Sequence, residues 1–319
     1  MADHSELDHA VADGTFLMIC GPTAAGKSGL ALALAERYGG VIINADSMQL
    51  YADLRVLTAR PDVSEEARVP HRLYGVLDGA ERASVASWLT MATREIETAR
   101  DAGRLPILTG GTGLYFHAAM KGLAPVPDVP PDIHAECIAE YAERGGEAFR
   151  RDLLELDPVL GSQLHDGDSQ RLVRAMGVVR ASGRALSAWQ ADPHEGAIAG
   201  RPVRVAMMPP REELYEKINT RFSAMMEGGA RSEVSTLAAR GLAPSLPVMK
   251  AIGVREIIAL QAGDIDEARA VELASRDSRR YAKRQMTWIR NNFHAEMILE
   301  KKFSERKMTE IFSILSKTG

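Results

Sequence analysis

Apolar residues follow two alternating patterns along the first 120 residues of the chain. Three continuous apolar runs have the length of buried strands: Phe16–Cys20, Val41–Ile43 and Leu105–Leu108. Between the second and the third run, apolar positions recur at helical spacing from about Val85 to Ala102. Strands that alternate with helices predict a doubly wound parallel sheet flanked by helices. Ligands of such sheets bind at the carboxyl ends of the strands.

A proline-rich segment, Pro125–Pro131, interrupts this alternation. From there to about Gly200 the apolar spacing is helical, whereas Arg201–Met207 again has the pattern of a strand. We therefore expect an all-helical insertion domain over residues 123–201, and a sheet-based core made of residues 15–122 and 202–300.

The two ends of the chain carry weaker patterns. Residues 1–14 are polar and charged and lack the layout of a signal peptide, so we expect a flexible leader. The tail, residues 301–319, fits an amphipathic helix and a frayed end equally well.

Composition excludes several classes of protein. The 319 residues are 45% hydrophobic, enough for a core, and the net charge of -4 argues against a wholly basic nucleic-acid binder but permits a local basic patch. Cys20 and Cys137 lack the spacing of a zinc site or disulfide framework, which favours a reducing cytoplasm. No apolar run approaches the ~20 residues that span a bilayer. Without a coiled-coil pattern or a large apolar stripe, we expect a monomer.

The first strand runs into a glycine loop, Gly21–Ser28, with the spacing Gly-x4-Gly-Lys-Ser. In this phosphate-loop pattern, backbone N–H groups and a helix N-terminus surround a phosphate, the lysine adds a charge, and the serine hydroxyl holds Mg²⁺. We therefore expect a phosphate-loop NTPase-like core with Ser28 as the metal-binding residue; the alternative is a glycine-rich turn without function. The loop alone does not identify the phosphate, and ATP is one possibility.

Two further loops follow the second and third strands. Asp46 lies just past the second strand and is either a general base, a group near Mg²⁺, or an N-cap. The third strand is followed by Thr109 and the run Gly110–Tyr115. A nucleotide hydrolase would have a carboxylate at this position, so the sequence disfavours an ATPase or GTPase. Thr112 among these glycines is suited to position a substrate, although a plain tight turn fits as well.

The strongest charge feature is Arg276–Arg290, in which basic residues are interleaved with Tyr281 and Trp288. Such a helix binds a phosphate backbone, or it is a solvated surface helix with buried aromatic anchors. Gln170–Arg174 is a weaker basic segment on a second expected helix.

Taken together and in this order, the motifs resemble those of the tRNA dimethylallyltransferases, or tRNA isopentenyl transferases. The resemblance covers roughly residues 15 to 295 and rests on these runs: Gly21–Ser28, Asn44–Gln49, Gly110–Tyr115, Gln170–Arg174 and Ala282–Trp288.

The resemblance implies a reaction. A dimethylallyl group moves from dimethylallyl diphosphate to the N6 amine of adenosine 37, next to the anticodon, in tRNAs that read codons beginning with U, with Mg²⁺ as cofactor. It also implies that the insertion domain contacts the anticodon stem-loop of the tRNA.

The resemblance assigns roles residue by residue. It gives the reaction itself to Asp46, Thr112 and Arg221. It assigns the diphosphate to Gly21, Pro22, Thr23, Ala24, Ala25, Gly26, Lys27 and Ser28. It assigns tRNA contacts to Asp46, Ser47, Met48, Gln49, Thr112, His134, Gln170, Arg171, Leu172, Val173, Arg174, Lys250, Gly253, Arg255, Lys283 and Arg284.

Three positions depart from the family pattern. His134 replaces an arginine that touches tRNA, and being mostly neutral at pH 7 it weakens that contact. Val254 replaces a tyrosine. Gly177 replaces a glutamate, which costs about 1 kcal/mol of helix preference if the position is exposed.

Three other functions remain open at this stage. A kinase would use the same loop for ATP, but it has no use for the Asp46 loop or the basic helix. A prenyltransferase acting on AMP or ADP would not need the basic helix and the insertion domain. A non-catalytic tRNA-binding module is disfavoured by the intact Lys27, Ser28 and Asp46.

Overall fold

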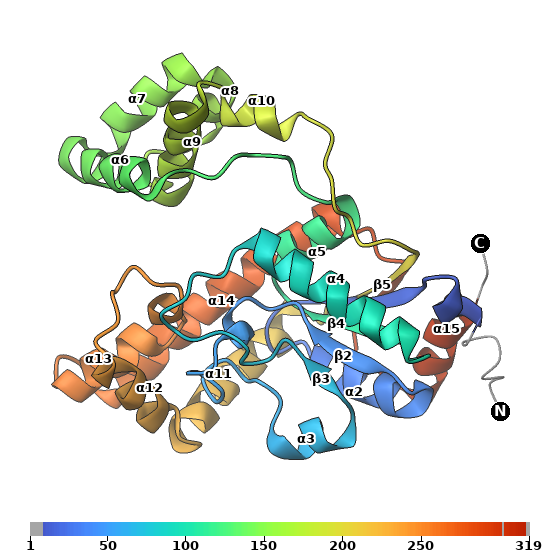
Figure 1. The fold of residues 1–319 in the computed structure, drawn as a ribbon. Helices are drawn as coiled ribbons and strands as arrows, with labels where there is room; N and C mark the ends of the chain where they lie inside the picture. Colours follow the sequence, from blue (N-terminus) through green and yellow to red (C-terminus); the bar gives the residue numbers. More distant parts are fainter. Residues whose placement is uncertain (1–8, 302, 317–319) are drawn as a thin grey trace. The chain divides into compact units, whose positions relative to one another are not determined.

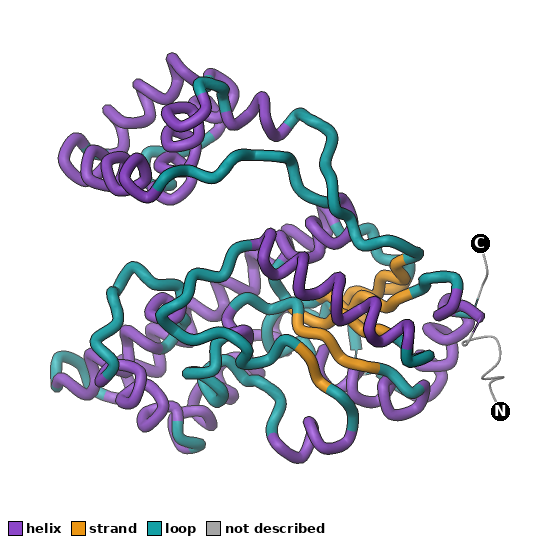
Figure 2. The backbone as a smooth tube through the Cα atoms, in the orientation of Figure 1, coloured by secondary structure: helices purple, strands orange, loops and turns teal. Residues whose placement is uncertain are grey.

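The computed structural model describes residues 9–301 and 303–316, which form two compact units. The larger unit takes the chain up to Met120 and from Ile198 onward, and the smaller unit is Lys121–Ala197. The larger unit combines a sheet with helices, whereas the described elements of the smaller one are helical (Figures 1 and 2).

A six-stranded parallel sheet forms the centre of the larger unit, in the order β3-β2-β4-β1-β5-β6. The strands are β1 (Phe16–Cys20), β2 (Val41–Asn44), β3 (His71–Arg72), β4 (Pro106–Gly110), β5 (Pro202–Met207) and β6 (Met297–Leu299). Every residue of β1, β2 and β4 is buried, as expected for strands covered on both faces. The predicted parallel α/β fold is confirmed, while the short strands β3 and β6 were not predicted.

Helices and two 3-10 turns connect and cover the strands. They are α2 (Lys27–Tyr38), η1 (Met48–Leu50), α3 (Val63–Arg68), α4 (Val85–Asp101), α5 (Gly113–Lys121), α11 (Arg211–Glu227), α12 (Ala230–Ala239), η2 (Val248–Lys250), α13 (Val254–Ala262), α14 (Glu267–Asn292) and α15 (Glu305–Leu315). The predicted helix at 85–102 corresponds to α4, which starts at a capping box in which Ser84 accepts the Ser87 N–H. Its apolar stripe buries Trp88 and Ile96.

The order of the strands produces a topological switch point at the carboxyl ends of β1 and β4, which are neighbours in the middle of the sheet. The chain leaves β1 toward β2 but leaves β4 toward β5, which lies on the other side of β1. At such a switch point the loops after adjacent strands diverge and leave room for a ligand. The loops after β1 and β4 are the phosphate loop and Gly110–Gly113, which we call the glycine loop.

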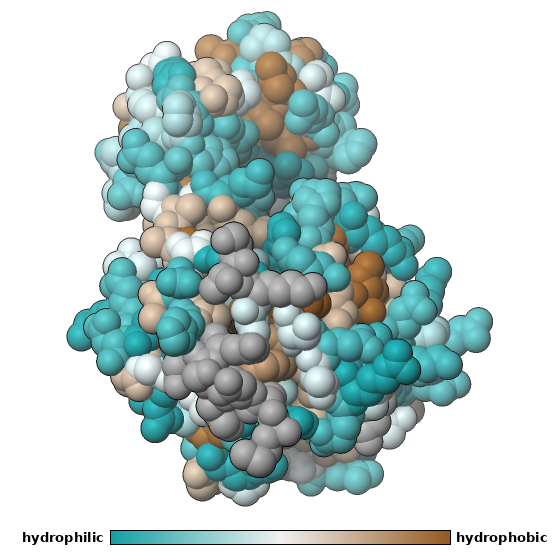
Figure 3. Space-filling model, turned by 90° about the vertical axis from the view of Figure 1, so that its right-hand side faces the viewer, coloured by the Kyte–Doolittle hydropathy of each residue, from teal (hydrophilic) through white to brown (hydrophobic). Residues whose placement is uncertain are grey.

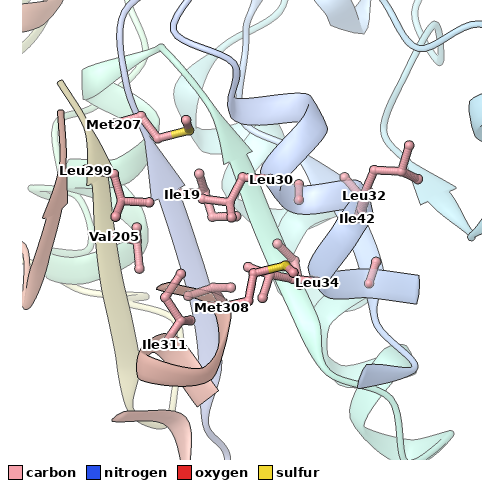
Figure 4. Packing of buried hydrophobic residues seen from close by; sticks show 14 of the residues in the cluster. Ile19, Leu30, Leu32, Leu34, Ile42, Val205, Met207, Leu299, Met308 and Ile311 are labelled. Atoms are coloured by element: carbon pink, nitrogen blue, oxygen red, sulfur yellow. The ribbon is translucent and has the colours of Figure 1, made fainter. Parts of the chain in front are cut away.

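Both ends of the described chain pack on the sheet. Met308 and Ile311 of α15 lie among residues of β1, α2 and β5 (Figure 4), and Phe312 stacks on Tyr38 with ring centroids 4.9 Å apart. The tail is therefore a packed helix over 305–315. The predicted flexible leader is wrong for its described part, because residues 9–12 are helical and Val11 belongs to the core; residues 1–8 lie outside the described chain.

The smaller unit is a cluster of five helices: α6 (Pro131–Arg144), α7 (Gly146–Leu156), α8 (Pro158–Gln163), α9 (Ser169–Ser182) and α10 (Leu186–Gln190). Phe149, Leu153 and Met176 are fully buried in its core. Gly177 is also buried, on α9, and a Cβ there would lie 3.1 Å from Val129 of the proline-rich segment. The loss of helix preference expected for an exposed glycine therefore does not apply to Gly177. Its missing side chain instead allows α9 to pack closely against Val129.

On the face drawn in Figure 3, polar residues predominate among the coloured ones and apolar residues form separate patches. Within residues 9–301 and 303–316, every helix is too short or too polar to cross a bilayer.

Candidate functional site

The phosphate loop joins β1 to α2 at the switch point. Its backbone turns through positive φ at Ala24 (64°) and Gly26 (91°) before α2 begins at Lys27. The Lys27 ammonium donates to the Pro22 carbonyl at 2.9 Å, so the charge lies over the loop. The Lys27 ammonium and the N-terminus of α2 thus lie at the same loop, an arrangement that favours the binding of an anion such as phosphate.

Burial shifts the pKa values of two groups at this loop, Lys27 and Cys20. Desolvation lowers the pKa of Lys27 from 10.5 to about 8, although the nearby Asp46 carboxylate opposes the shift. Desolvation raises the pKa of the Cys20 thiol to about 12. Lys27 is therefore a cation that gains from a bound anion, whereas Cys20 stays a neutral thiol.

The loop after β2 holds Asp46 in place through backbone and side-chain bonds. The buried Asn44 amide donates to the carbonyls of Asp46 and Leu73, both at 2.9 Å, and its oxygen accepts the Asp46 N–H at 2.8 Å. Asp46 Oδ1 accepts the Met48 N–H at 3.1 Å, a bond just before η1, whose N-cap residue is Ser47 and has no side-chain capping bond. Asp46 is therefore not the N-cap of the element that follows it, and it lines both cavities described below.

Thr112 of the glycine loop is bonded to the Asp46 loop. Its Oγ1 accepts the Ser47 N–H at 3.0 Å, and its own N–H donates to the Ala45 carbonyl at 3.2 Å. The predicted positioning residue thus lies directly beside the predicted base.

Arg221 reaches the same place from α11. Its guanidinium donates to Thr23 Oγ1, and desolvation lowers its pKa while the Asp46 carboxylate opposes the shift. Lys217, one turn earlier on α11, lines the same cavity as the phosphate loop. Sequence reasoning missed Lys217; its spacing of four residues before Arg221 is the signal that places both on one helix face.

Two adjoining cavities share four lining residues: Thr23, Asp46, Thr58 and Arg221. The polar cavity, of about 280 Å³, is lined by the phosphate loop and Lys217. The second cavity, of about 90 Å³, has a mixed lining; besides the four shared residues it adds Ser278, Tyr281 and the apolar side chains of Met48, Leu57, Ile218, Phe222, Met225, Ala251 and Ile252, for which we call it the apolar cavity. The phosphate cradle thus adjoins a smaller cavity that is lined in part by apolar side chains, and a carboxylate and an arginine are among the residues that the two cavities share.

The donor set around the polar cavity suits Mg²⁺ shared with a substrate. The exposed Ser28 hydroxyl and the Asp46 carboxylate are oxygen donors, and the Thr109 hydroxyl at the cavity wall is buried with no partner in the described part of the chain. Residues 9–301 and 303–316 contain no cluster of three His, Cys, Asp or Glu that would hold a metal on its own. Mg²⁺ commonly takes few protein ligands and completes its shell with phosphate and water oxygens, so the residues fit it.

The remaining predicted tRNA residues of the larger unit differ in accessibility. Lys250, Arg255, Lys283 and Arg284 are exposed, whereas Gly253 is buried against Leu57 and Phe222. Gln49 holds its own loop, since its amide donates to the carbonyls of Thr58 (2.9 Å) and Ala59 (3.0 Å). Val254, the residue in place of the family's tyrosine, is fully buried.

In the smaller unit, His134, Gln170 and Arg171 are exposed and Arg174 is half-buried. Leu172 and Val173 belong to the core of this unit. Their side chains are therefore unavailable to RNA, and a contact there would have to use the backbone.

Gln285 of α14 was not predicted, although it bonds two of the loops that form the site. It is buried, and its amide bonds the phosphate loop on one side and the glycine loop on the other. The signal was present in the sequence: a glutamine lies among the apolar positions Ala282, Met286 and Ile289 of an amphipathic helix. A polar residue in a buried stripe needs hydrogen-bond partners, and here they are the two loops.

The fold and this site define an enzyme of the phosphate-loop class. The sequence profile of the family described as IPP transferase matches residues 49–292, a range that begins after the phosphate loop.

Several known proteins similar to the chain are named tRNA dimethylallyltransferase. The chain is 48% identical over 304 residues to the tRNA dimethylallyltransferase of Rhodospirillum rubrum (94% of this chain, 93% of the relative) and 50% identical over 273 residues to that of Phenylobacterium zucineum (86% and 88%). The crystal structure of the tRNA isopentenylpyrophosphate transferase from Bacillus halodurans is similar with a TM-score of 0.66 at 31% identity, covering 95% of each chain. The chain belongs to the IPP transferase family, a family of prenyltransferases, and the resemblance seen in its motifs is confirmed.

Proposed function

We propose that the protein transfers a dimethylallyl group from dimethylallyl diphosphate to the N6 amine of adenosine 37 in tRNAs that read codons beginning with U. The observation that carries the proposal is the junction of the two cavities: a phosphate cradle meets an apolar space at Asp46, Thr23 and Arg221. An allylic diphosphate has this same division between a charged and a hydrocarbon half. The names of the relatives support tRNA as the acceptor.

The charged half of the donor is the leaving group. When the bond between the allylic carbon and oxygen breaks, the electron pair and negative charge stay on the diphosphate, and donors already aimed at that position lower the barrier. Lys27 and Arg221 supply positive charge from the phosphate loop and from α11. Mg²⁺ held by Ser28 would add charge to the same oxygens.

The acceptor half of the reaction is assigned to the Asp46 loop. The adenine N6 nitrogen attacks the allylic carbon, one nitrogen–carbon bond forms, and the N6 proton passes to the Asp46 carboxylate. An exocyclic amine is a weak nucleophile, so its orientation by Asp46 and Thr112 contributes as well as proton removal. The family resemblance assigns Ser47, Met48 and Gln49 to the adenine as well, although Met48 lines the apolar cavity and Gln49 the polar one.

Adenosine 37 must leave the anticodon stack before it reaches this site. Extruding a base costs a few kcal/mol, which contacts with the phosphate backbone offset. Exposed Lys283 and Arg284 on α14 are suited to make such contacts in the larger unit, and exposed Arg171 in the smaller one; Gln170 and His134 are exposed there too, and His134 makes the weaker contact.

Acceptor choice tests the proposal. The protein is incubated with dimethylallyl diphosphate and Mg²⁺ together with an anticodon stem-loop, the same stem-loop with guanosine at position 37, or AMP. We expect a product only with adenosine 37 of the stem-loop, identified by mass spectrometry of the nucleosides. Modified AMP would instead identify a free-nucleotide prenyltransferase, and label transfer from γ-labelled ATP without a prenyl donor would identify a kinase.

A further inference from the structure

A single buried amide connects the two halves of the site. Gln285 Oε1 accepts the Thr23 N–H of the phosphate loop at 2.9 Å, and Gln285 Nε2 donates to the Gly111 carbonyl of the glycine loop at 2.9 Å. The side chain is 6% exposed, so water has little access to these bonds.

Each bonded loop carries a different part of the proposed machinery. On the phosphate-loop side, Gln285 accepts the backbone N–H of Thr23, and the Thr23 hydroxyl accepts a hydrogen bond from the Arg221 guanidinium. On the other side, Gly111 directly precedes Thr112, which bonds the Asp46 loop through Ser47. The diphosphate side and the acceptor side are therefore connected through one glutamine.

The glycine loop lies close against this amide. A Cβ added to Gly111 would lie 2.1 Å from Gln285 Nε2, so this close approach depends on the glycine. The amide also has a defined orientation, because one partner is a donor and the other is an acceptor. A residue without both an acceptor and a donor cannot replace it.

We propose that Gln285 is a positioning residue for group transfer: it fixes the spacing of the phosphate loop and the glycine loop, and hence of the diphosphate relative to the acceptor amine. The proposal rests on the proposed function. It predicts that loss of the amide lowers kcat much more than it weakens the binding of either substrate.

The test compares the full-length wild type with Gln285→Met, which keeps the length of the side chain and removes both bonds. The control is Gln261→Met on α13: Gln261 is exposed but also bridges two partners, the Arg231 carbonyl (2.9 Å) and Ser235 Oγ (2.7 Å), and it lines neither cavity. For each protein, kcat, the KM for dimethylallyl diphosphate, the Kd for the stem-loop and the thermal midpoint are measured.

We expect kcat of Gln285→Met to fall about tenfold or more, with the Kd for the stem-loop within about threefold, because small misplacements of reacting groups cost far more in rate than in binding. Gln261→Met should keep the wild-type kcat. A kcat of Gln285→Met within about twofold of wild type overturns the proposal, and so does a loss explained by a reduced folded fraction. If the wild type itself makes no dimethylallyl product, it is the proposed function that fails.

Gln285→Glu provides a second arm should the methionine variant fold poorly. Protonated glutamic acid offers a carbonyl to Thr23 and an O–H to Gly111, as glutamine does, whereas the carboxylate offers acceptors only. Dividing kcat by the wild-type value at each pH removes titrations common to both proteins. The ratio should rise as the pH is lowered from about 8 to 6, since burial favours the protonated acid; a ratio independent of pH overturns the proposal.

Discussion

Because the pKa of Lys27 is lowered, we expect the affinity for dimethylallyl diphosphate to depend on pH between about 7 and 9. Over this range the phosphate groups of the ligand are already almost fully ionised. With a pKa of about 8 in the free protein, about nine-tenths of Lys27 is protonated at pH 7 and about one-tenth at pH 9. A bound diphosphate stabilises the ammonium, so binding takes up a proton above pH 8. If only the protonated form binds, affinity falls about tenfold between pH 7 and 9, or about 1.4 kcal/mol.

Calorimetric titration with dimethylallyl diphosphate and Mg²⁺, without RNA, measures this effect because no turnover occurs. Phosphate groups with a second pKa near 6 are fully ionised above about pH 7.5, and Cys20, with its pKa raised to about 12, stays neutral. The control is Lys27→Arg, whose guanidinium remains charged throughout and should remove the dependence on pH. A flat wild-type affinity from pH 7 to 9, or an equal decline in Lys27→Arg, would refute the reasoning.

Three further predictions concern the chemistry, the RNA surface and the fold. Asp46→Asn keeps an acceptor for the Met48 N–H, so the loop and the Kd for the stem-loop should change little. Loss of the carboxylate as proton acceptor should lower kcat about 10²- to 10⁴-fold; equal losses of kcat and binding would make Asp46 a binding residue. Arg284→Ala should weaken tRNA binding and reduce the slope of log K against log salt by about 1, whereas Arg269→Ala, at the start of the same helix and paired with Glu272, should leave the slope unchanged. Ile311→Ala, fully buried in α15, should lower the free energy of unfolding by about 2–5 kcal/mol in urea titrations; a loss below about 0.5 kcal/mol would mean that α15 does not belong to the core.

The central part of the fold was predictable because its strands are buried on both faces. Continuous apolar runs identified β1, β2 and β4, and the loops after them carry motifs with their own spacing. The strands β3 and β6 contain two and three residues, too few to show a period, and exist because neighbouring strands supply their hydrogen bonds. Local sequence does not contain that information.

The site was predictable where a motif carried its chemistry and unpredictable where partners come from distant segments. Lys27, Asp46, Thr112 and Arg221 lie together as the resemblance implied. The amphipathic pattern of α14 marks Gln285 as a buried polar residue, but its bonding partners lie 262 and 174 residues away in the sequence, and no local pattern identifies them. For Leu172, the motif suggested a contact with RNA, but the amphipathic pattern of α9 buries the side chain.

The most direct test of the account is a single-turnover reaction with enzyme in excess over an anticodon stem-loop, in the presence of dimethylallyl diphosphate and Mg²⁺. Released diphosphate and the mass of the RNA are followed together. We predict one diphosphate released for each stem-loop that gains one dimethylallyl group at adenosine 37. Diphosphate release without a gain in RNA mass, or an RNA that remains unmodified throughout, would contradict it.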